Sequence, residues 1–505
     1  MTSRKNVQIL NGPWLRQGNS KHSELYERIR EGIVSGEMPA TYRLPSTRFL
    51  SEQLGVARNT ICFAYEQLQS EGYVESRRGS GHYVVNVTDA FQRLATGNTP
   101  AAPPQPGSGE IQEDFGFVPS TFRWAIPPVP FRANYPALDR TGMQAWIALY
   151  SKELRRAARS PSHPGYFGET DAAGHILLRR AIAEHISLSR GVRCSPEQVV
   201  VTAGSQHAMD LLMRVIGRPG GRAWIEDPCF PGALAVIRGA HLVPVSVPVD
   251  GEGINVAYGT SIAPGACLAI VCTKQYPLGY MMSLQRRLAL IEWAREHKSW
   301  IIEDDYDSEY RFLGKTIPSL QGLDGGNHVI YVGTFSKVLF PGLRIGFIVA
   351  PQRLIDPIIA VRAVAGRHGN PLDQQVLARF ITEGHLGRHI HKMRKLYRAR
   401  MDALLHSGKR WLGGAVELDR AEAGLQTIGH LSEEFDDRLV SQAAAARGIE
   451  VADLSRYCTV LKRSPSLVFG FGGFDEKEIE IGAQALARVL ETMRGGAALG
   501  AIATS

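Results

Sequence analysis

The sequence predicts a multidomain protein: a small helical amino-terminal part, then a larger α/β part that ends in a smaller α+β region. Three observations support this fold class. The chain has 505 residues, more than one hydrophobic core usually organises. A stretch rich in Pro and Gly interrupts it near residue 100. Beyond that stretch, short apolar runs alternate with helical patterns, which is typical of a sheet covered by helices on both faces.

Composition and charge limit the classes of function. The chain is 44% hydrophobic and 21% charged, as in globular proteins, and its net charge of +8 suggests an anionic partner. The first 86 residues carry 11 Lys or Arg against 8 Asp or Glu, an excess too small to indicate nucleic-acid binding without a motif. Six scattered cysteines without C-x-x-C spacing argue against a zinc site or a disulfide framework. We therefore expect no metal site and a reducing compartment.

Targeting and membrane segments are not expected either. The start of the chain, "MTSRKNVQILNGPWLRQG", has no sustained apolar region of the kind that a secretory signal needs. No apolar run approaches the roughly 18 residues of a membrane-spanning helix. These patterns predict a cytoplasmic protein without a membrane partner.

The stretch "LATGNTPAAPPQPGSGEIQED", residues 94–114, predicts a semi-extended linker because it lacks apolar periodicity. A long surface loop within one domain is the alternative. The expected organisation is a first domain at 1–86 with its core at 20–86, a linker at 87–114, and a second domain at 115–505. The last part of that domain, from about 380 to 505, is expected to form a small subdomain.

The first part has the pattern of a helix-turn-helix. Its first helix carries one apolar stripe at i, i+4 spacing, formed by Leu25, Ile29 and Ile33. Ser46, after a proline, is a good N-cap for a second, short helix, and Gly55 is suited to end it. A third helix follows at once, and two helices joined by a tight turn containing Gly form this motif.

The third helix and the segment after it present polar and basic groups. The helix begins with Arg58, Asn59 and Thr60, which are suited to base edges and phosphates. The following "YVESRRGSGHYVV" places Arg77 and Arg78 at a Gly-Ser-Gly tip between two strand-like runs. An isolated arginine pair favours a solvated turn. After a helix-turn-helix, the same pair favours a wing that contacts DNA.

These residues, "LPSTRFLSEQLGVARNTICFAYEQLQSEGYVESRRGSGHYV", resemble the winged helix of GntR-type bacterial transcription regulators. Ala57 is a departure, since the family often carries serine there. The resemblance implies an operator DNA partner. The DNA contacts it implies are Arg43, Ser46, Thr47, Arg48, Arg58, Asn59, Thr60, Arg77, Arg78, Gly79, Ser80 and Gly81.

The larger part predicts a parallel sheet. Its nearly continuous apolar strands are expected at 199–203, 223–226, 268–272, 300–305 and 329–334. A long helical stretch, residues 374–405, follows them, and an α+β region with strand-like "GLQTIGHL" and "SLVFGF" ends the chain.

Lys337 follows the last of these strands, at the carboxyl edge where open α/β sheets bind ligands. Lysine is among the residues least often fully buried unless it is paired. The hydroxyls of Thr334 and Ser336 and the guanidinium of Arg344 are close in sequence and suit a phosphate. Alone, this lysine would favour a side chain that reaches solvent.

Two other strand ends add chemistry at the same edge. The strand 300–305 ends in Asp304 and Asp305, and Tyr306 follows. The strand 199–203 opens into a Gly-Ser-Gln turn, where a helix N-terminus offers free N–H groups to an anion. Singly these features favour a solvated turn and a helix cap. Together, an amine, a phosphate cradle and a carboxylate with a tyrosine form the set that pyridoxal 5'-phosphate (PLP) requires.

At these residues the chain resembles the fold-type-I aminotransferases and, more specifically, the MocR/GabR-type regulators, which join a GntR winged helix to an aminotransferase-like domain. Matching stretches include "VTAGSQHAMDLLMRV", "IIEDDYDSEYRF" and "VIYVGTFSKVLFPGLRIGF". The resemblance implies that Lys337 forms the Schiff base, Asp304 pairs with the pyridine nitrogen and Tyr306 binds the ring hydroxyl. It further implies that Phe230 stacks on the ring. The phosphate site it implies is formed by Thr334, Arg344, Gly204, Ser205 and Gln206.

Departures from the family pattern concern the effector. Thr273-Lys274-Gln275 stands where the family commonly reads "SHQ", and Gln426 stands where it often has histidine. Val468 lies near the position of the arginine with which aminotransferases bind a carboxylate. We place the effector beside Gln275 and Tyr276. An effector with an unusual acid group, one lacking an acid, and an arginine from elsewhere in the chain all remain open.

The leading function is that of a PLP-dependent transcription regulator in which an amino compound reacts at Lys337 and alters operator binding. The resemblance implies a head-to-tail homodimer, which would supply two DNA half-sites. A working aminotransferase with an accessory DNA-binding domain is one alternative. A regulator that senses PLP itself is another. The effector, the operator and the direction of regulation are not predicted.

Overall fold

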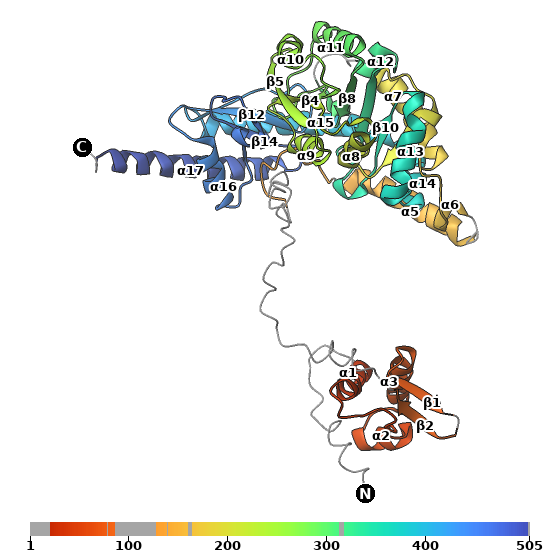
Figure 1. Ribbon diagram of the computed structural model, residues 1–505. Helices are drawn as coiled ribbons and strands as arrows, with labels where there is room; N and C mark the ends of the chain where they lie inside the picture. Colours follow the sequence, from red (N-terminus) through yellow and green to blue (C-terminus); the bar gives the residue numbers. More distant parts are fainter. Residues whose placement is uncertain are drawn as a thin grey trace. The chain divides into compact units, whose positions relative to one another are not determined.

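The structure, a computed structural model, describes residues 21–77, 79–85, 128–138, 140–159, 164–312 and 318–502. The chain divides into two compact units, Met1–Glu113 and Asp114–Ser505. In Figure 1 the first unit is drawn in red and orange and the second from light orange to blue. The predicted linker at 87–114 lies outside the described residues.

The first unit is a winged helix, as predicted. Ser46 caps its second helix, because the Ser46 hydroxyl accepts a hydrogen bond from Phe49 N at 3.2 Å, and Gly55 (φ 60°) ends that helix. The two strands that follow the third helix pair antiparallel and form the wing. The elements are α1 (Lys21–Val34), α2 (Thr47–Leu54), α3 (Arg58–Ser70), β1 (Val74–Arg77) and β2 (Gly81–Val84).

Apolar side chains from all three helices close the core of this unit. The predicted stripe on α1 is buried, and it packs against the inner face of α3. The Tyr65 hydroxyl donates to the carbonyl oxygen of Pro45 at 2.9 Å and so connects α3 to the segment before α2. The buried residues include Leu25, Ile29, Ile33, Leu50, Ile61, Tyr65 and Leu68.

The second unit is organised around an eight-stranded sheet with the order β3-β10-β9-β8-β7-β4-β5-β6. Figure 1 shows helices on both of its faces. In chain order the strands are β3 (Val199–Thr202), β4 (Arg222–Asp227), β5 (Val243–Asp250), β6 (Gly253–Ile254), β7 (Leu268–Cys272), β8 (Trp300–Asp305), β9 (Val329–Thr334) and β10 (Gly346–Val349).

The sheet is mixed and not wholly parallel, which corrects the prediction from the sequence. β10 runs antiparallel to both β9 and β3, and β6 runs antiparallel to β5. A parallel return needs a crossover of a dozen or more residues, usually a helix. Only residues 335–345 connect β9 to β10, and they contain just the 3₁₀ turn η5 (Pro341–Leu343). The segment that carries Lys337 is therefore a tight connection.

Strand β3 shows how the helices cover the sheet. Val199 and Val201 pack in one cluster with side chains of α7 and α14, and Val200 packs in another with side chains of α8 and α13. Alternate residues of a strand point to opposite faces, so both faces are buried. The helices are α5 (Arg140–Arg159), α6 (Pro164–Phe167), α7 (Ile176–Arg190), α8 (Ser205–Ile216), α9 (Pro231–Gly239), α10 (Val256–Ile262), α11 (Leu284–His297), α12 (Leu320–Asp324), α13 (Gln352–Gly366) and α14 (Pro371–Thr382).

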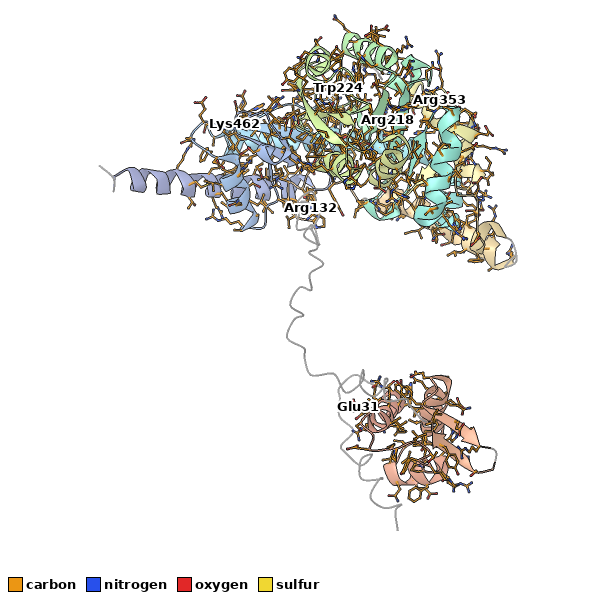
Figure 2. The ribbon with its side chains drawn as sticks, in the orientation of Figure 1. Glu31, Arg132, Arg218, Trp224, Arg353 and Lys462 are labelled. Atoms are coloured by element: carbon orange, nitrogen blue, oxygen red, sulfur yellow. The ribbon has the colours of Figure 1, made fainter. Side chains whose placement is uncertain are left out.

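Trp224, labelled in Figure 2, connects β4 to the helices that cover it. Its ring stacks on that of Trp293 of α11 with 3.9 Å between the ring centres. Its Nε1 atom donates to the carbonyl oxygen of Ala263 at 2.9 Å. An indole nitrogen buried in this way needs such a partner, because an unpaired buried donor destabilises the fold.

The last part of the chain packs a four-stranded sheet against long helices. The sheet has the order β11-β12-β14-β13. The helical stretch predicted at 374–405 is in fact two helices, because Gly384 between them takes a left-handed φ of 75°. The elements are α15 (His385–Trp411), β11 (Val416–Leu418), β12 (Gln426–Leu431), α16 (Asp437–Ala445), β13 (Ala452–Asp453), β14 (Ser466–Gly470) and α17 (Glu476–Ile502). Three more 3₁₀ turns are η3 (Pro196–Gln198), η4 (Ser308–Tyr310) and η6 (Leu454–Tyr457).

Candidate functional site

Lys337 lies at the edge of the large sheet where the carboxyl ends of β3, β7, β8 and β9 meet. Its side chain is partly buried, and its Nζ atom donates to the carbonyl oxygen of Asn134 at 2.8 Å. Burial lowers the pKa of Lys337 from 10.5 to about 8; Asp307 opposes this shift, Arg344 adds to it and Asp304 opposes it. The amine is thus held in place, and its pKa is shifted toward neutral pH.

Asp304, at the end of β8, has an unused acceptor. Its side chain is 5% exposed, and its Oδ1 atom is buried without a hydrogen-bond partner among the described residues. Burial, and then the negative charges of Asp305 and Asp307, raise its pKa from 3.8 to about 7, while Lys337 acts in the opposite direction. Asp304 is therefore a buried carboxyl without the partner that would keep it ionised.

The neighbouring Asp305 has a different environment, because its carboxylate is fully engaged. Arg190 of α7 donates its Nε–H to Asp305 Oδ2 at 2.7 Å, and the Tyr331 hydroxyl donates to the same oxygen at 2.7 Å. The Ser308 hydroxyl donates to Oδ1. Asp305 thus supports the fold behind the site, whereas Asp304 faces it.

The residues predicted to hold a phosphate come together beside β3 and β9. A Cβ atom added to Gly204 would lie 3.6 Å from the guanidinium of Arg344, so this arginine lies against the turn that begins α8. Ser336 N donates to Thr334 Oγ1 at 3.2 Å, and the Ser336 hydroxyl is buried without a partner among the described residues. Ser205 opens α8, whose first N–H groups are free to bind an anion.

Gln206 uses its side chain differently from the other residues of this turn. Its Nε2 atom donates to the carbonyl oxygen of Gly232 at 3.0 Å and connects α8 to α9. Its Oε1 atom is buried without a partner among the described residues. One N–H of the Gln206 side chain and its backbone N–H are therefore the groups that could contact a phosphate.

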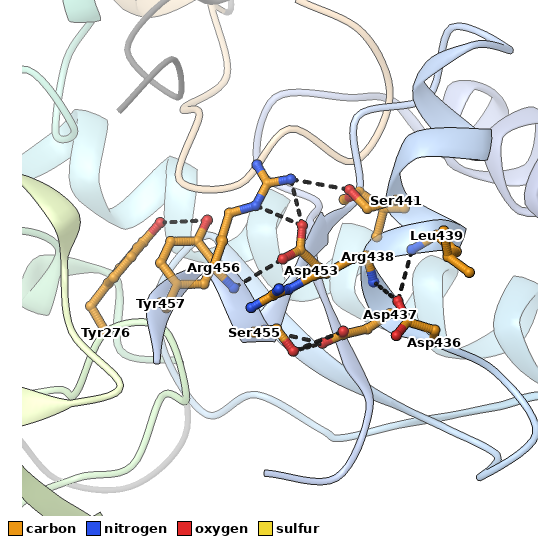
Figure 3. Close-up of polar contacts among 11 residues, drawn as sticks. Tyr276, Asp436, Asp437, Arg438, Leu439, Ser441, Asp453, Ser455, Arg456 and Tyr457 are labelled. Atoms are coloured by element: carbon orange, nitrogen blue, oxygen red, sulfur yellow. Dashed lines mark hydrogen bonds and ion pairs between the residues drawn. The ribbon is translucent and has the colours of Figure 1, made fainter. Parts of the chain in front are cut away.

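An aromatic cluster forms one wall of the site. The ring centre of Tyr276 lies 5.7 Å from that of Phe230, 5.9 Å from that of Tyr306 and 5.4 Å from that of Tyr457. The Tyr306 hydroxyl is buried without a partner among the described residues. Figure 3 shows Tyr457 between Tyr276 and Arg456. These side chains bring β4, β7, β8 and η6 to one place.

Gln275 and Tyr276, predicted to contact the effector, have unequal freedom. The Gln275 amide is held mainly by the backbone: Nε2 donates to the oxygens of Pro228 and Tyr276, and Oε1 accepts from Leu278 N. The Tyr276 hydroxyl has one long contact, 3.4 Å, to the Tyr457 hydroxyl. Gln275 thus shapes the turn, while Tyr276 presents its side chain to the site.

The sequence prediction missed three groups that lie here: the backbone oxygen of Asn134 and the side chains of Lys274 and Asp307. Asn134 precedes the aminotransferase-like strands and gave no signal. Lys274 was noticed as a departure, but its partner was not: its Nζ atom lies 2.6 Å from Asp307 Oδ2, and both side chains are buried. The four-residue run of Asp304 to Asp307 contains that partner, and the spacing alone could not identify it.

The predicted DNA-contacting residues lie on the exposed surface of the winged helix. Arg48, Arg58 and Asn59 are exposed in the first turns of α2 and α3, and the exposed Arg43 precedes α2 and pairs with Tyr83 of β2 through a backbone bridge. The Nε–H of Arg58 donates to Thr47 Oγ1 at 3.2 Å, which connects the two helices of the motif. Thr60 is half-buried, and Ser46 uses its hydroxyl as the cap of α2.

The wing brings a further arginine to the same unit. Arg77 donates to Glu75 Oε1 and lies over the Tyr83 ring, 4.5 Å from its centre. Both Arg77 and Glu75 are about half exposed, so the pair is weak and Arg77 can exchange its partner. Gly79 and Ser80 form the tip, and Gly81 lies close to the Arg43 side chain. Arg78 lies outside the described residues.

Comparisons with known families decide the relationship. Residues 21–84 match the bacterial regulatory proteins of the gntR family, and residues 146–485 match aminotransferase class I and II. The probable rhizopine catabolism regulatory protein MocR of Rhizobium meliloti is 36% identical over 489 residues, which cover 95% of each chain. This chain belongs to the MocR-type transcription regulators.

Other MocR-type regulators are similar along most of their length. The pyridoxine biosynthesis regulator PdxR of Corynebacterium glutamicum is 30% identical over 90% of this chain and 92% of its own. The regulator TauR of Rhodobacter capsulatus is 33% identical over 77% of this chain and 79% of its own. Relatives with different named pathways thus share the architecture of this MocR-type protein.

Solved structures confirm the aminotransferase fold of the second unit. LysN, an α-aminoadipate aminotransferase of Thermus thermophilus solved with a phosphopyridoxyl-leucine ligand, is 25% identical with a TM-score of 0.67, over 75% of this chain and 96% of its own. The kynurenine aminotransferase of Pyrococcus horikoshii is 24% identical with a TM-score of 0.63, over 72% and 89%. Within the described residues of this MocR-type chain, no helix has the length and apolarity needed to cross a membrane.

Proposed function

We propose that this MocR-type protein is a PLP-dependent regulator whose winged helix binds operator DNA and whose second unit binds a small amine. The observation that carries the proposal is the environment of Lys337. Its amine has a lowered pKa, and at the same sheet edge the buried acceptor of Asp304 and the buried hydroxyl of Tyr306 have no hydrogen-bond partner within the described part of the chain. The same chain carries a GntR-type winged helix.

The side chains at this edge fit the cofactor. A buried polar atom without a partner costs about 1–3 kcal/mol, so several of them in one place indicate a ligand. Asp304 would keep a proton at the ring nitrogen, Tyr306 would bind the ring hydroxyl, and Phe230 would stack on the ring. The phosphate would be held by a group of hydroxyls, N–H groups and one guanidinium from Thr334, Ser336, Gly204, Ser205, Gln206 and Arg344.

When bound, PLP supplies an aldehyde that condenses with primary amines and a ring that withdraws electrons. Lys337 would hold it through the Nζ atom. Displaced by an effector amine, Lys337 would carry or pass a proton at Nζ, and a pKa near 8 keeps both protonation states accessible. The effector would thus interact differently with two states of the protein, which any change in DNA binding requires.

The DNA half of the proposal depends on the exposed arginines of α3 and the wing. Arg58 would read a base edge, and Arg77 would contact phosphate. A homodimer, arranged head to tail, would present two winged helices to two half-sites. The cytoplasm is the compartment that fits a DNA-binding protein of this family.

Transamination is the second candidate function, because the residues expected to handle the cofactor are present and the solved neighbours include aminotransferases. We place regulation first because the curated relatives that cover most of this chain carry the names of regulators. Partial reactions at Lys337 are compatible with that role.

The test is the visible absorbance of bound cofactor in the purified protein, followed by operator binding with and without amines. Lys337→Ala should lose the absorbance, whereas Lys477→Ala, at an exposed position on α17, should keep it. Retained absorbance in Lys337→Ala would contradict the assignment. Sustained release of a carbonyl product would favour the enzyme, and a response to free PLP alone would favour a cofactor sensor.

A further inference from the structure

A buried ion pair lies beside the proposed cofactor residues without a role in holding the cofactor. Lys274 Nζ is 2.6 Å from Asp307 Oδ2, and the two residues are 3% and 1% exposed. Lys274 also donates to the Ala423 oxygen at 3.4 Å and lies 5.3 Å from the Tyr306 ring centre. Asp307 Oδ1 is buried without a hydrogen-bond partner among the described residues. The pair is neutral, but one acceptor is unused.

The start of β12 closes over this pair. A Cβ atom at Gly424, where φ is 86°, would overlap Lys274 Nζ and Asp307 Oδ2, so only glycine allows this approach. Gln426, two residues later, is 4% exposed. Its Nε2 atom donates to the Pro277 oxygen at 3.4 Å, and in this orientation its Oε1 atom has no partner among the described residues. Lys274, Asp307 and Gln426 are called the effector subsite below.

Two nearby positions were candidates for a cation that binds a carboxylate, and neither provides a cation without a partner of its own. Val468 on β14 is fully buried in an apolar cluster with Tyr276 and Ile428. Arg456, adjacent to Tyr457, directs Nε and Nη2 to Asp453 Oδ1 at 2.8 and 2.6 Å, as Figure 3 shows. The charge of Arg456 is thus already balanced, and that of Lys274 is balanced by Asp307.

The unused capacity of the subsite favours hydroxyl groups. A carboxylate only accepts hydrogen bonds, so it would face Asp307 Oδ1 as a like charge and leave Gln426 Oε1 unsatisfied. A hydroxyl donates to either oxygen, and its own oxygen can accept the third N–H of Lys274, which has two acceptors in contact. Hydroxyl groups can therefore satisfy each of these atoms, whereas a carboxylate cannot.

We propose that Lys274, Asp307 and Gln426 bind hydroxyl groups, so that the effector is a primary amine with hydroxyls and no carboxylate, an amino alcohol or amino polyol. This inference rests on the proposed function, because the amine of the same molecule must react at the cofactor held by Lys337. It identifies the chemical class to which this regulator responds.

Three probes with one carbon skeleton test the inference on the full-length protein with bound cofactor. Serinol has two hydroxymethyl groups beside its amine, serine replaces one of them with a carboxylate, and isopropylamine has neither group. The change in visible absorbance gives each affinity, and operator binding by fluorescence anisotropy gives the response. Serinol should bind at least about ten-fold more tightly than either of the others, the effect of one satisfied buried acceptor.

Variants connect this preference to the subsite. Gln426→Met keeps the volume and the ion pair but removes the acceptor, so the affinity for serinol should fall about ten-fold, toward that for isopropylamine. Asp307→Asn should also lower the affinity for serinol. If Asp307→Asn does not fold, Gln426→Met alone still tests the subsite. Glu417→Gln, exposed on β11, is the matched control and should retain the preference.

The outcomes separate this inference from the proposed function. Equal or tighter binding of serine, or an unchanged preference for serinol in both variants, would overturn the effector class alone. Wild-type protein without visible cofactor absorbance, or absorbance that no amine changes, would overturn both proposals.

Discussion

Lys274 and Asp307 bridge the ends of two neighbouring strands, with 2.6 Å between Nζ and Oδ2. Lys274 follows β7 and Asp307 follows β8, and neither side chain reaches solvent. Removing one partner of a buried ion pair leaves an uncompensated charge, which costs about 3–5 kcal/mol, whereas replacing both with apolar residues is often neutral. The stability of this part of the fold should therefore depend on the pair as a unit.

We expect Lys274→Met and Asp307→Leu each to lower the free energy of unfolding of the second unit by about 3–5 kcal/mol. The double variant should lose much less unfolding free energy than the sum of the losses in the two single variants. Six of the seven tryptophans lie beyond residue 113, so tryptophan fluorescence during urea unfolding reports mainly this unit. Additive losses in the double variant would show that the two side chains do not interact.

Asp305 should matter for stability more than its neighbour Asp304. Asp305→Ala removes the acceptor that Arg190, Tyr331 and Ser308 share, so we expect a loss of about 3–5 kcal/mol in the unfolding free energy. Asp304→Ala removes no contact of this kind and is the matched comparison. Equal losses in the two variants, measured by the same unfolding assay, would contradict the difference between these carboxylates.

These adjacent aspartates show how far the sequence predicts the site. The strand that carries Asp304 near its end was evident from its apolar run, and the resemblance to aminotransferases predicted that Asp304 pairs with the cofactor. The partner of Asp305 was not predictable, because Arg190 is distant in the sequence and only packing of α7 on the sheet brings it there. The contact between Lys274 and Asp307 escaped prediction for the same reason.

The fold itself was largely accessible from periodicity, with two informative exceptions. Continuous apolar runs predicted the buried strands, but the direction of β10 depends on the shortness of residues 335–345, which apolar periodicity does not indicate. Helical periodicity continues through 374–405, yet Gly384 divides it because its left-handed φ ends one helix and begins the next. Local conformation overrode the pattern in both places.

Asp304 should make the stability of the cofactor-free protein depend on pH. Its pKa is about 7 in the folded chain, against 3.8 ordinarily, so between these values the folded chain binds its proton more tightly than the unfolded chain. Raising the pH through this window therefore destabilises the fold. Asp304→Asn removes the effect, so the variant should gain stability relative to wild type, by roughly 1–4 kcal/mol, between pH 4 and 7.5.

The measurement is urea unfolding of both cofactor-free proteins at several pH values. Asp305, Asp307 and Lys337 act on Asp304, and the buried Glu226, whose raised pKa of about 8 is due to burial and in part to Asp304, lies beside it; all four remain in the variant. A difference between variant and wild type that is the same at pH 4 and pH 7.5 would contradict the raised pKa of Asp304.

Arg58 and Arg77 should weaken DNA binding in different ways. Arg58 begins α3, the recognition helix, and is connected to Thr47 of α2, so it is placed to read a base. Arg58→Ala should therefore cost about 1–3 kcal/mol of binding free energy on an operator that the wild-type protein has selected from random DNA. The same variant should lose much less binding free energy on unrelated DNA. A loss of the same size on both DNAs would instead make Arg58 a phosphate contact.

Arg77 lies in the wing, where its weak pair with Glu75 leaves it free to neutralise a phosphate. Arg77→Ala should therefore weaken binding to the selected operator and to unrelated DNA alike, and the slope of log affinity against log salt should fall in magnitude by about 1. Arg30→Ala, which removes an arginine paired with Glu27 on α1, is the matched control and should leave both quantities unchanged. An unaltered salt slope in Arg77→Ala would show that the wing arginine does not meet the DNA backbone, and the phosphate contacts would then have to come from the start of α2 and α3.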